Sequence, residues 1–264
     1  MSPEVAEASF HAALDAGVNH LDIAPGYGAA EANVGPHVPA VRHRLFISEK
    51  STRANPDGLR AQMEHSLRTL GCDSFDVFQA HAVTDLAELD RRGPAIEAIL
   101  KARDEGLCRF VGVTGHDFGT AAAQLEAVRR YDLDTVMLPV YAGALANPQY
   151  ATDLAALLDE AQRRDLGVMA IKVGAHQPWG DRTPTRGCWY EPFTDAERLA
   201  RGVRFTLSTP GVHACCSTGD VGILPMLIEA AMHYTPMTPA ERDALLTEAA
   251  EWPTIFPLAQ HAKG

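Results

Sequence analysis

Short apolar runs alternate with helical segments along the whole chain. Seven runs have the length of strands and are rich in Val, Ile, Leu or Phe without strict two-residue alternation, which is typical of strands buried in a parallel sheet. These predicted strands are Val18–Ile23, Leu45–Glu49, Phe75–Ala80, Arg109–Thr114, Thr135–Tyr141, Val168–Val173 and Val212–Cys216.

The segments around these strands carry apolar residues at helical spacing. The predicted helices are Glu4–Ala16, Pro56–Leu70, Ile96–Glu105, Phe118–Arg130, Thr152–Arg164, Asp195–Leu207, Asp220–His233 and Pro239–Ala250. Four glycines stand shortly before a strand and are expected to end the preceding helix, as glycine does in a C-terminal cap. They are Gly17, Gly71, Gly106 and Gly167.

The spacing of the strands predicts the fold class. Successive strands begin about 26 to 45 residues apart, which is the rhythm of βα units joined by right-handed crossovers. Seven such units favour a (β/α)8 barrel of the TIM type over an open doubly wound sheet, and no Gly-x-Gly-x-x-Gly follows the first strand. The chain opens on a helix, so either the first barrel strand is missing or another segment fills its place. We expect a single domain over residues 1–264.

Composition narrows the classes of function. The chain has 264 residues, of which 46% are hydrophobic and 22% charged, as in a globular protein. The net charge is 23 − 34 = −11, which argues against a nucleic-acid binder. No apolar run approaches a membrane span, and MSPEVAEASF lacks the features of a signal peptide. The five cysteines have no CxxC spacing, so a reducing cytoplasm is expected and a zinc ribbon is not.

The polar residues that end the strands are the candidates for chemistry, because the active site of a βα barrel forms at the carboxyl ends of its strands. A Lys50–Asp22 pair would offset the cost of burying the carboxylate, and Lys50 would lower the pKa of Tyr27. Tyr27 would then donate a proton to a carbonyl oxygen that His81 orients. The candidates are Asp22, Tyr27, Lys50, His81, Thr114, His116 and Lys172.

Four segments, in this order, resemble the aldo-keto reductase family: GVNHLDIAPGYGAAEANVG, RLFISEKS, SLRTLGCDSFDVFQAHAV and GLCRFVGVTGHD. The family pattern Asp-Thr-Ala-x-x-Tyr-Gly is here Asp22-Ile23-Ala24-Pro25-Gly26-Tyr27-Gly28. The resemblance runs from about residue 5 to about residue 235. It implies an (α/β)8 barrel that reduces a carbonyl with a nicotinamide cofactor, usually NADPH. It also implies that Asp22, Tyr27, Lys50 and His81 are the catalytic tetrad.

The resemblance also carries departures that concern the cofactor. Family members normally have a hairpin and a first barrel strand ahead of Glu4, and either a shifted start or a shortened protein would explain their absence. Many members have Ser-Asn where this chain has Thr114-Gly115-His116. The usual glutamine aligns near Leu138, and the tyrosine that stacks on nicotinamide aligns with Ile171.

The segment Ser217-Thr218-Gly219-Asp220 bears on the choice of cofactor. Members that prefer NADP place a cation here, whereas this chain has none, and Asp220 would repel a 2′-phosphate and accept a ribose hydroxyl. The family favours NADP(H) and the local chemistry leaves NAD(H) open. Ser217 and Thr218 would cap the following helix or bind phosphate at its start. Lys172 would reach the pyrophosphate or a substrate acid. The cofactor candidates are thus Thr114, Gly115, His116, Lys172, Ser217, Thr218 and Asp220.

Three functions remain open at this point. The first is an oxidoreductase that reduces an aldehyde or ketone with NAD(P)H. The second is a barrel with weakened nicotinamide binding that acts in proton transfer, sensing or interaction. The third is a metal-dependent hydrolase using His20, Asp22, His81 and His116, although no HxH or bridging-lysine pattern supports a metal. The expected partner is a small carbonyl compound, with neither nucleic acid nor membrane, and an exposed barrel edge favours a homodimer that covers it.

Overall fold

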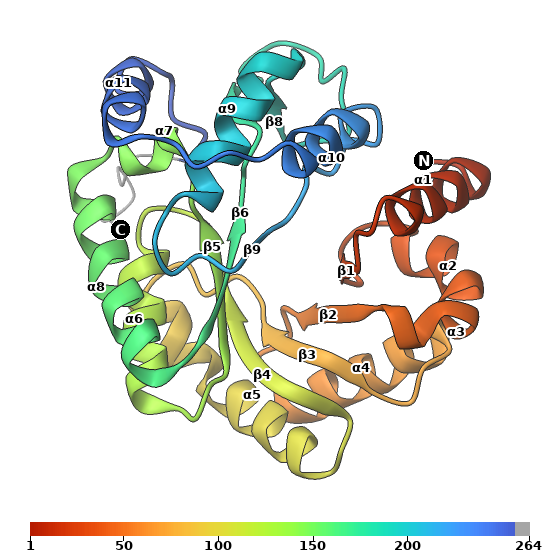
Figure 1. Ribbon diagram of the computed structural model, residues 1–264. Helices are drawn as coiled ribbons and strands as arrows, with labels where there is room; N and C mark the ends of the chain where they lie inside the picture. The colour runs from red at the N-terminus through yellow and green to blue at the C-terminus, as the bar shows by residue number, and fades with distance from the viewer. Residues whose placement is uncertain (257–264) are drawn as a thin grey trace. The chain divides into compact units, whose positions relative to one another are not determined.

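The computed structural model describes residues 1–256, which form two compact units (Figure 1). The first unit comprises Met1–Thr114 and Glu126–Thr135, and the described part of the second comprises Gly115–Leu125 and residues 136–256. A seven-stranded sheet has the strand order β1-β2-β3-β4-β5-β6-β9, and β7 and β8 form a separate two-stranded sheet. The strand pairs β1–β2, β2–β3, β3–β4 and β6–β9 are parallel.

The strands of the main sheet match the seven apolar runs predicted from the sequence. They are β1 (His20–Asp22), β2 (Phe46–Ser51), β3 (Phe75–Ala80), β4 (Cys108–Thr114), β5 (Thr135–Pro139), β6 (Gly167–Ile171) and β9 (Ala214–Cys215). The two end strands, β1 and β9, are much shorter than the apolar runs that predicted them. An end strand has only one neighbour to satisfy its backbone groups, so fewer residues are held in the ladder.

The hairpin β7 (Ala175–Pro178) and β8 (Tyr190–Pro192) was not predicted. It lies in the long polar segment after β6 and pairs antiparallel, with an irregularity between Ala175 and Gln177. A single short hairpin leaves too weak an alternation of apolar and polar residues to be read from the sequence.

The helices of the first unit are α1 (Pro3–Asp15), α2 (Ala30–Val34), η1 (Gly35–His37), α3 (Val38–Val41), η2 (Arg42–Arg44), α4 (Pro56–Leu70) and α5 (Leu86–Asp104). Helix α5 begins ten residues before its predicted start because Asp85 caps it, its side chain accepting a hydrogen bond from Glu88 N at 2.8 Å. Pro94 lies inside α5, where proline normally ends or kinks a helix, and the predicted helix began only after it.

The core of the first unit lies between β2–β4 and the helices α4 and α5, which contact these strands (Figure 1). Its central side chains are fully buried, among them Leu59, Met63, Phe75 and Val77. Truncating one of them to alanine would cost roughly 2–5 kcal/mol. This core holds β2 and β3, the two strands that carry Lys50 and lead to His81, in fixed register.

The helices of the second unit are α7 (Ala142–Leu145), α8 (Pro148–Arg164), α9 (Ala196–Leu207), α10 (Leu224–Met232) and α11 (Pro239–Ala249), and α6 (Thr120–Arg130) has residues in both units. One apolar cluster includes Val173, Leu199, Val203 and Ile223. The predicted helix Pro239–Ala250 is confirmed as α11. The last residues of the expected tail, 257–264, lie outside the described part of the chain.

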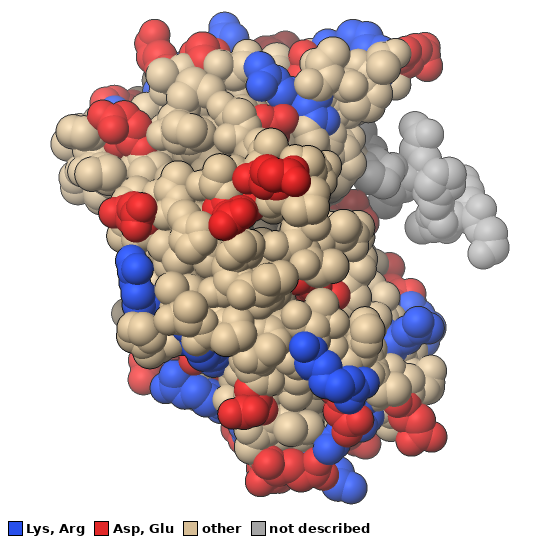
Figure 2. Space-filling model, turned by 90° about the vertical axis from the view of Figure 1, so that its right-hand side faces the viewer, with Lys and Arg blue, Asp and Glu red and all other residues tan. Residues whose placement is uncertain are grey.

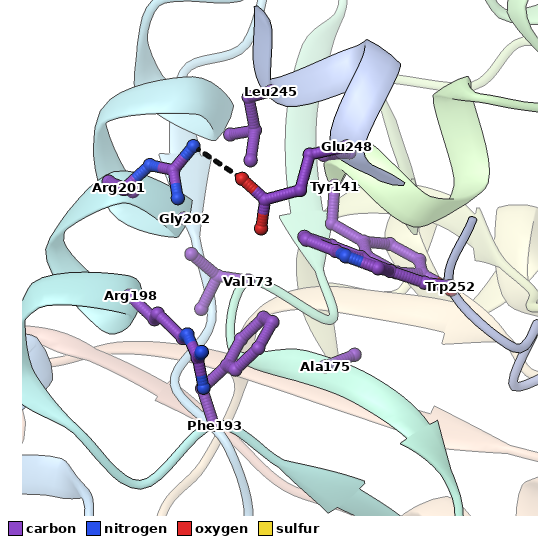
Figure 3. A pocket seen from close by; sticks show the side chains of 11 residues that line it. Tyr141, Val173, Ala175, Phe193, Arg198, Arg201, Gly202, Leu245, Glu248 and Trp252 are labelled. Carbon is purple, nitrogen blue, oxygen red and sulfur yellow. Dashed lines mark hydrogen bonds and ion pairs between the residues drawn. The ribbon is translucent and has the colours of Figure 1, made fainter. Parts of the chain in front are cut away.

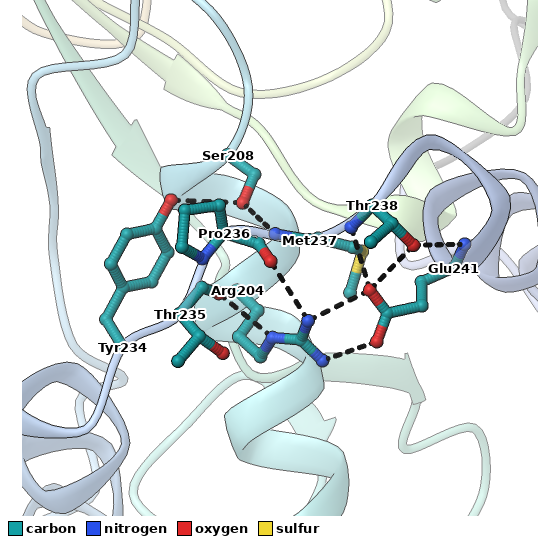
Figure 4. Close-up of polar contacts among 8 residues, drawn as sticks. All are labelled: Arg204, Ser208, Tyr234, Thr235, Pro236, Met237, Thr238 and Glu241. Atoms are coloured by element: carbon teal, nitrogen blue, oxygen red, sulfur yellow. Dashed lines mark hydrogen bonds and ion pairs between the residues drawn. The ribbon is translucent and has the colours of Figure 1, made fainter.

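Polar contacts tie α9 to the segment that leads into α11 (Figure 4). The Arg204 guanidinium donates to both carboxylate oxygens of Glu241, at 2.9 and 3.0 Å, and also to the carbonyls of Thr235 and Pro236. Thr238 and Glu241 form a capping box at the start of α11. The Arg204 hydrogen bonds lower the pKa of Glu241 to about 2, so this carboxylate is charged at neutral pH.

Three of the four glycines expected to end helices have the left-handed backbone that this role requires. Gly17, Gly71 and Gly106 have φ angles of 88°, 62° and 82°. Gly167 lies in β6 instead, and the prediction for it is wrong. Asp165, with φ 57°, takes the left-handed position at the end of α8, because aspartate tolerates that region better than most side chains.

The surface shown in Figure 2 carries Lys and Arg side chains interspersed with Asp and Glu rather than one continuous basic area on this face. This distribution agrees with the net charge of −11. Within residues 1–256, no helix has both the length and the apolar character that crossing a bilayer requires.

Candidate active site

The first unit brings Asp22 and Lys50 together at the carboxyl ends of β1 and β2. The parallel register pairs Asp22 with Ser48, two residues before Lys50 on β2, and side chains two apart on a strand share a face. The Lys50 ammonium donates to a carboxylate oxygen of Asp22. Lys50 is 1% exposed and the Asp22 side chain 17%. The ion pair therefore offsets the free-energy cost of removing each charge from water.

Tyr27 and His81 lie beside this pair. Tyr27 stands in the turn after β1, where its amide donates to the Ala24 carbonyl at 3.0 Å. The Lys50 ammonium lies 5.2 Å from the centroid of the Tyr27 ring, and the ring centroids of Tyr27 and His81 are 6.3 Å apart. Tyr27 is 47% exposed. All four tetrad candidates thus gather in one unit.

Strained backbone follows several strands of the main sheet. Within residues 1–256, four non-glycine residues have positive φ, and three of them come just after a strand: Ala82, Asp117 and Lys172, with φ angles of 62°, 78° and 75°. Such conformations cost roughly 1–3 kcal/mol each and concentrate at functional sites. Ala82 directly follows His81, so the chain turns sharply at that candidate.

Glu49 is a buried carboxyl beside Lys50 in the chain that sequence reasoning did not single out. It is fully buried, and burial raises its pKa to about 9, with the nearby Glu31 carboxyl adding to the rise. Its Oε1 accepts a hydrogen bond from the Lys50 amide at 2.9 Å, while its Oε2 has no hydrogen-bond partner within the described residues. Glu49 therefore carries a proton at neutral pH. A glutamate within the apolar run LFISEKS could have indicated this buried carboxyl from the sequence.

Gln79 was missed as well. It is fully buried on β3, paired in register with Lys50 of β2. Neither its amide nitrogen nor its amide oxygen has a hydrogen-bond partner in the part of the chain that the structure describes. The Gln79 amide, at the register position opposite Lys50, is therefore a second buried polar group at this level of the sheet. A glutamine inside the apolar run FDVFQA was the available signal.

The alternative of a metal site at His20, Asp22 and His81 finds no support in the first unit. His20 Nε2 is 2.6 Å from the hydroxyl of Ser48, and burial lowers its pKa. Among residues 1–256, the group of His, Cys, Asp and Glu side chains close enough to share an ion contains neither these residues nor His116.

Thr114 ends β4 in the first unit, while the other cofactor candidates lie in the second. Thr114 is buried, and its carbonyl accepts from Val83 N at 2.9 Å. Gly115 N donates to the Met137 carbonyl at 3.1 Å. The Trp189 ring lies near two of these candidates. Its centroid is 6.4 Å from the ring centroid of His116 and 5.1 Å from the Lys172 ammonium.

Trp189 and Tyr190 hold Lys172 by cation–π contacts, with the ammonium 5.4 Å from the Tyr190 ring. Trp189 is 55% exposed, so one part of its ring remains open. The sequence analysis placed Lys172 among the candidates without naming these two aromatic partners. They come from β8 and the segment before it, which the sequence did not define.

The surroundings of Asp220 differ from the expectation. Its carboxylate accepts from Gly187 N at 2.8 Å and Gly222 N at 2.9 Å, and the Arg186 guanidinium lies 3.7 Å away. The segment 217–220 itself contains no cation, but Arg186, from the long loop before β8, brings a guanidinium beside Asp220. The Asp220 oxygens are also already engaged by backbone amides, so a ribose hydroxyl would compete with them.

Ser217 and Thr218 do not cap the helix that follows them. Helix α10 begins at Leu224, several residues later than predicted, and its N-cap residue Ile223 makes no side-chain capping bond. The capping role expected for the two hydroxyls is therefore wrong. Ser217 is exposed, whereas Thr218 is buried and its hydroxyl has no hydrogen-bond partner within residues 1–256.

A small pocket in the second unit is separate from every candidate residue (Figure 3). Val173, Phe193, Leu245 and Trp252 form its apolar lining, and an Arg201–Glu248 ion pair of 2.8 Å stands at its rim. None of the predicted site residues lines it, so it does not add to the candidate active site.

Comparison with known proteins identifies the family. The model of the Aldo/keto reductase family matches residues 1–177. A 6-dehydroglucose reductase of Novosphingobium aromaticivorans is 28% identical over 58% of this chain and 65% of its own length, so the chain spans just under two thirds of that relative. A D-threo-aldose 1-dehydrogenase of a Pseudomonas species is 25% identical over 97% of this chain and 85% of its own.

Solved structures agree on the fold. The crystal structure of an aldo-keto reductase from Klebsiella pneumoniae in complex with NADPH has a TM-score of 0.69 and 21% identity, over 96% of this chain and 87% of its own. The seven βα strands of this chain therefore correspond to an incomplete (β/α)8 barrel. Because the family model matches well over half of its residues, the chain belongs to the aldo/keto reductase family.

Proposed function

We propose that this protein is an NAD(P)H-dependent oxidoreductase that reduces the carbonyl group of an aldehyde or ketone to an alcohol, with Tyr27 as the general acid. The observation that carries the proposal is the convergence of the Lys50–Asp22 ion pair, Tyr27 and His81 in one unit. An acid, a nearby cation and an imidazole are the groups that protonation of a carbonyl oxygen requires.

Each tetrad residue has a distinct task in this proposal. Tyr27 donates its phenolic proton to the carbonyl oxygen as that oxygen gains negative charge. The Lys50 ammonium, 5.2 Å from the ring centroid, favours the tyrosinate that remains. Asp22 fixes the ammonium in place, and His81 holds the carbonyl oxygen by a hydrogen bond. The reduced nicotinamide, when bound, supplies the hydride for the carbonyl carbon.

The second unit contains groups that fit the phosphates of a nicotinamide dinucleotide. Lys172 supplies positive charge for the pyrophosphate, Arg186 supplies it for a 2′-phosphate, and Ser217 and Thr218 supply hydroxyls. We propose that these four residues hold the cofactor, with Thr114, Gly115 and His116 near the nicotinamide end as the family resemblance implies.

Arg186 makes NADP(H) the preferred form in this proposal. A guanidinium that pairs with one carboxylate still has N–H groups that can donate hydrogen bonds to a 2′-phosphate. Replacement of Arg186 by alanine is expected to weaken NADPH binding about tenfold or more and to leave NADH binding nearly unchanged. Arg182→Ala on the same loop is the matched control, since Arg182 pairs with Glu191 instead. Equal weakening of both cofactors by Arg186→Ala would argue against this role.

The substrate class follows from the relatives, not from the site. Two relatives are named for sugar-derived substrates, as a 6-dehydroglucose reductase and a D-threo-aldose 1-dehydrogenase. We therefore propose aldoses and oxidised sugars as the first carbonyl compounds to assay. The half-exposed Trp189 ring in the second unit offers the flat apolar surface on which sugar rings stack.

A second candidate function is proton transfer without a redox step. It is favoured by Asp220, whose carboxylate is occupied by Gly187, Gly222 and Arg186, and by Thr114-Gly115-His116 in place of Ser-Asn. Both features would weaken nicotinamide binding.

Calorimetric titration of the full chain with NADPH and then with NADH distinguishes the two candidates. Saturable binding of either dinucleotide, with turnover of a sugar aldehyde, supports the reductase. Absence of binding by a protein that unfolds cooperatively would overturn it and favour proton transfer alone.

A further inference from the structure

A second group of ligand-type side chains lies among the helices of the first unit. Glu7 and His11 belong to α1, and His37 is the last residue of η1. Each offers one donor atom, and the three atoms all lie within 4.8 Å of one another. We propose that Glu7, His11 and His37 form a binding site for a divalent metal ion, zinc, which links α1 to η1. The tetrad shares none of these residues, so the site is independent of the proposed reduction.

The spacing of the donors suits a tetrahedral ion. Glu7 and His11 are four residues apart on α1, which places both side chains on one helix face. His37 Nδ1 is 3.8 Å from Glu7 Oε1. Bonds of about 2.0–2.2 Å place tetrahedral ligand atoms about 3.4 Å apart, so small side-chain rotations would close the site. Two imidazoles and one carboxylate, with water in the fourth position, are a ligand set that zinc accepts.

The backbone beneath the site is held in place by packing. Phe10, which is 8% exposed, anchors α1, and its ring contacts both imidazoles, with centroid distances of 5.6 Å to His11 and 6.3 Å to His37. Gly35, two residues before His37, packs so closely on α4 that an added Cβ would lie 2.1 Å from the Thr69 carbonyl oxygen. Both supporting elements are therefore packed against their neighbours, which suits a preorganised metal site.

A simple ion pair does not account for the whole group. Attraction between Glu7 and protonated His37 would explain those two residues. It leaves out His11, whose ring lies edge-on to that of His37 at a centroid distance of 5.4 Å.

The test is direct metal binding by the full chain, freed of any affinity tag and treated with chelator. The protein is dialysed against ZnCl2 and its zinc content measured, and the affinity is determined by calorimetry. The wild-type chain is expected to hold one equivalent and to gain melting temperature with zinc. Glu7→Gln, His11→Ala and His37→Ala are each expected to lower the affinity at least about tenfold, since even a lost outer partner of a metal ligand costs that much.

His65→Ala is the matched control, because His65 is exposed on α4 outside the group and its variant should bind zinc as the wild type does. Far-UV circular dichroism without zinc checks that every variant is folded. Substitution by Co²⁺, whose visible spectrum reports tetrahedral geometry, gives a readout that a general loss of stability would not produce. Wild-type affinity in any one of the three ligand variants would overturn the three-ligand site, and so would binding of no zinc by the wild-type chain.

Discussion

At the scale of single residues, burial decides the charge state of the groups around Lys50. Lys50 is almost completely buried, and its ammonium pairs with the Asp22 carboxylate. Its neighbour Glu49 is equally buried, and burial raises its pKa to about 9. Within residues 1–256, no cationic side chain forms an ion pair with Glu49. Glu49 and Lys50 are both buried, but in the described part of the chain only Lys50 forms an ion pair.

Replacement of Tyr27 by phenylalanine tests the general acid. The variant keeps the ring beside Lys50 and His81 but removes the proton that is to be donated. We expect kcat for carbonyl reduction to fall at least about 100-fold, with nicotinamide binding unchanged. Steady-state kinetics and calorimetry measure the two effects separately. Tyr131→Phe serves as control, and a Tyr27→Phe enzyme with near wild-type kcat would remove Tyr27 from the chemistry.

Glu49 is expected to make the protein less stable as pH rises. Between the ordinary carboxyl pKa of 4.5 and the folded value of about 9, the native state keeps a proton that the unfolded state has released. Stability therefore falls with rising pH across this window. The charged groups that act on Glu49 are Glu31, Lys50 and Asp22.

Replacement of Glu49 by glutamine removes this dependence. We expect Glu49→Gln to gain stability relative to the wild type between pH 5 and pH 9, by at most about 6 kcal/mol. Urea unfolding at several pH values measures it, with Glu97→Gln on the exposed side of α5 as control. A constant difference between Glu49→Gln and wild type over this range would contradict the raised pKa.

At the scale of elements, an N-cap residue type predicts where a helix begins only if its side chain is not already hydrogen-bonded to another part of the chain. Asn55, Asp85 and Thr238 accept hydrogen bonds from the first turns of α4, α5 and α11, as their residue types suggest. Asp220 has the same residue type but its carboxylate binds Gly187 and Gly222 instead. Helix α10 consequently begins later than the sequence predicts.

The capping box of α11 gives a quantitative prediction for an element. Replacement of Thr238 by alanine removes the hydroxyl that accepts from Glu241 N and donates to its carboxylate. The free energy of unfolding is expected to fall by about 1 kcal/mol. Urea denaturation measures the change, and Thr238→Ser, which restores the hydroxyl, should recover most of it. Equal losses in both variants would show that the methyl group, not the cap, matters.

At the scale of the whole molecule, the succession of seven strands agrees with the fold of a solved aldo-keto reductase structure, which matches with a TM-score of 0.69. The sequence placed the strand runs correctly because each is a continuous apolar stretch bounded by helical spacing. It did not give the β7–β8 hairpin or the full length of α5, where the local signals were weak or contradictory.

The thiols report on global unfolding. All five cysteines are free. Burial raises the pKa of Cys72 and Cys215 to about 11 and that of Cys108 to about 12, and it also raises the pKa of Cys188. Because the thiolate is the reactive form, these four should react with a thiol reagent far more slowly in the native protein at pH 8 than in the unfolded chain.

Labelling with and without urea, followed by mass spectrometry, measures these rates. Five labels are expected in urea and at most one rapid label under native conditions. Rapid native labelling of two or more cysteines would show that the units open without global unfolding.

The sequence by itself determined the order of strands and helices, and it is the source of the proposal that four residues form the tetrad and of the chemistry that they suggest. These depend on neighbouring residues, whose spacing sets which face each side chain occupies. Only the tertiary structure placed Arg186 beside Asp220, Trp189 and Tyr190 around Lys172, and Glu31 near Glu49. Contacts between residues far apart in the chain depend on the path of every loop between them, and burial, which sets the charge of Glu49, exists only after the chain has folded.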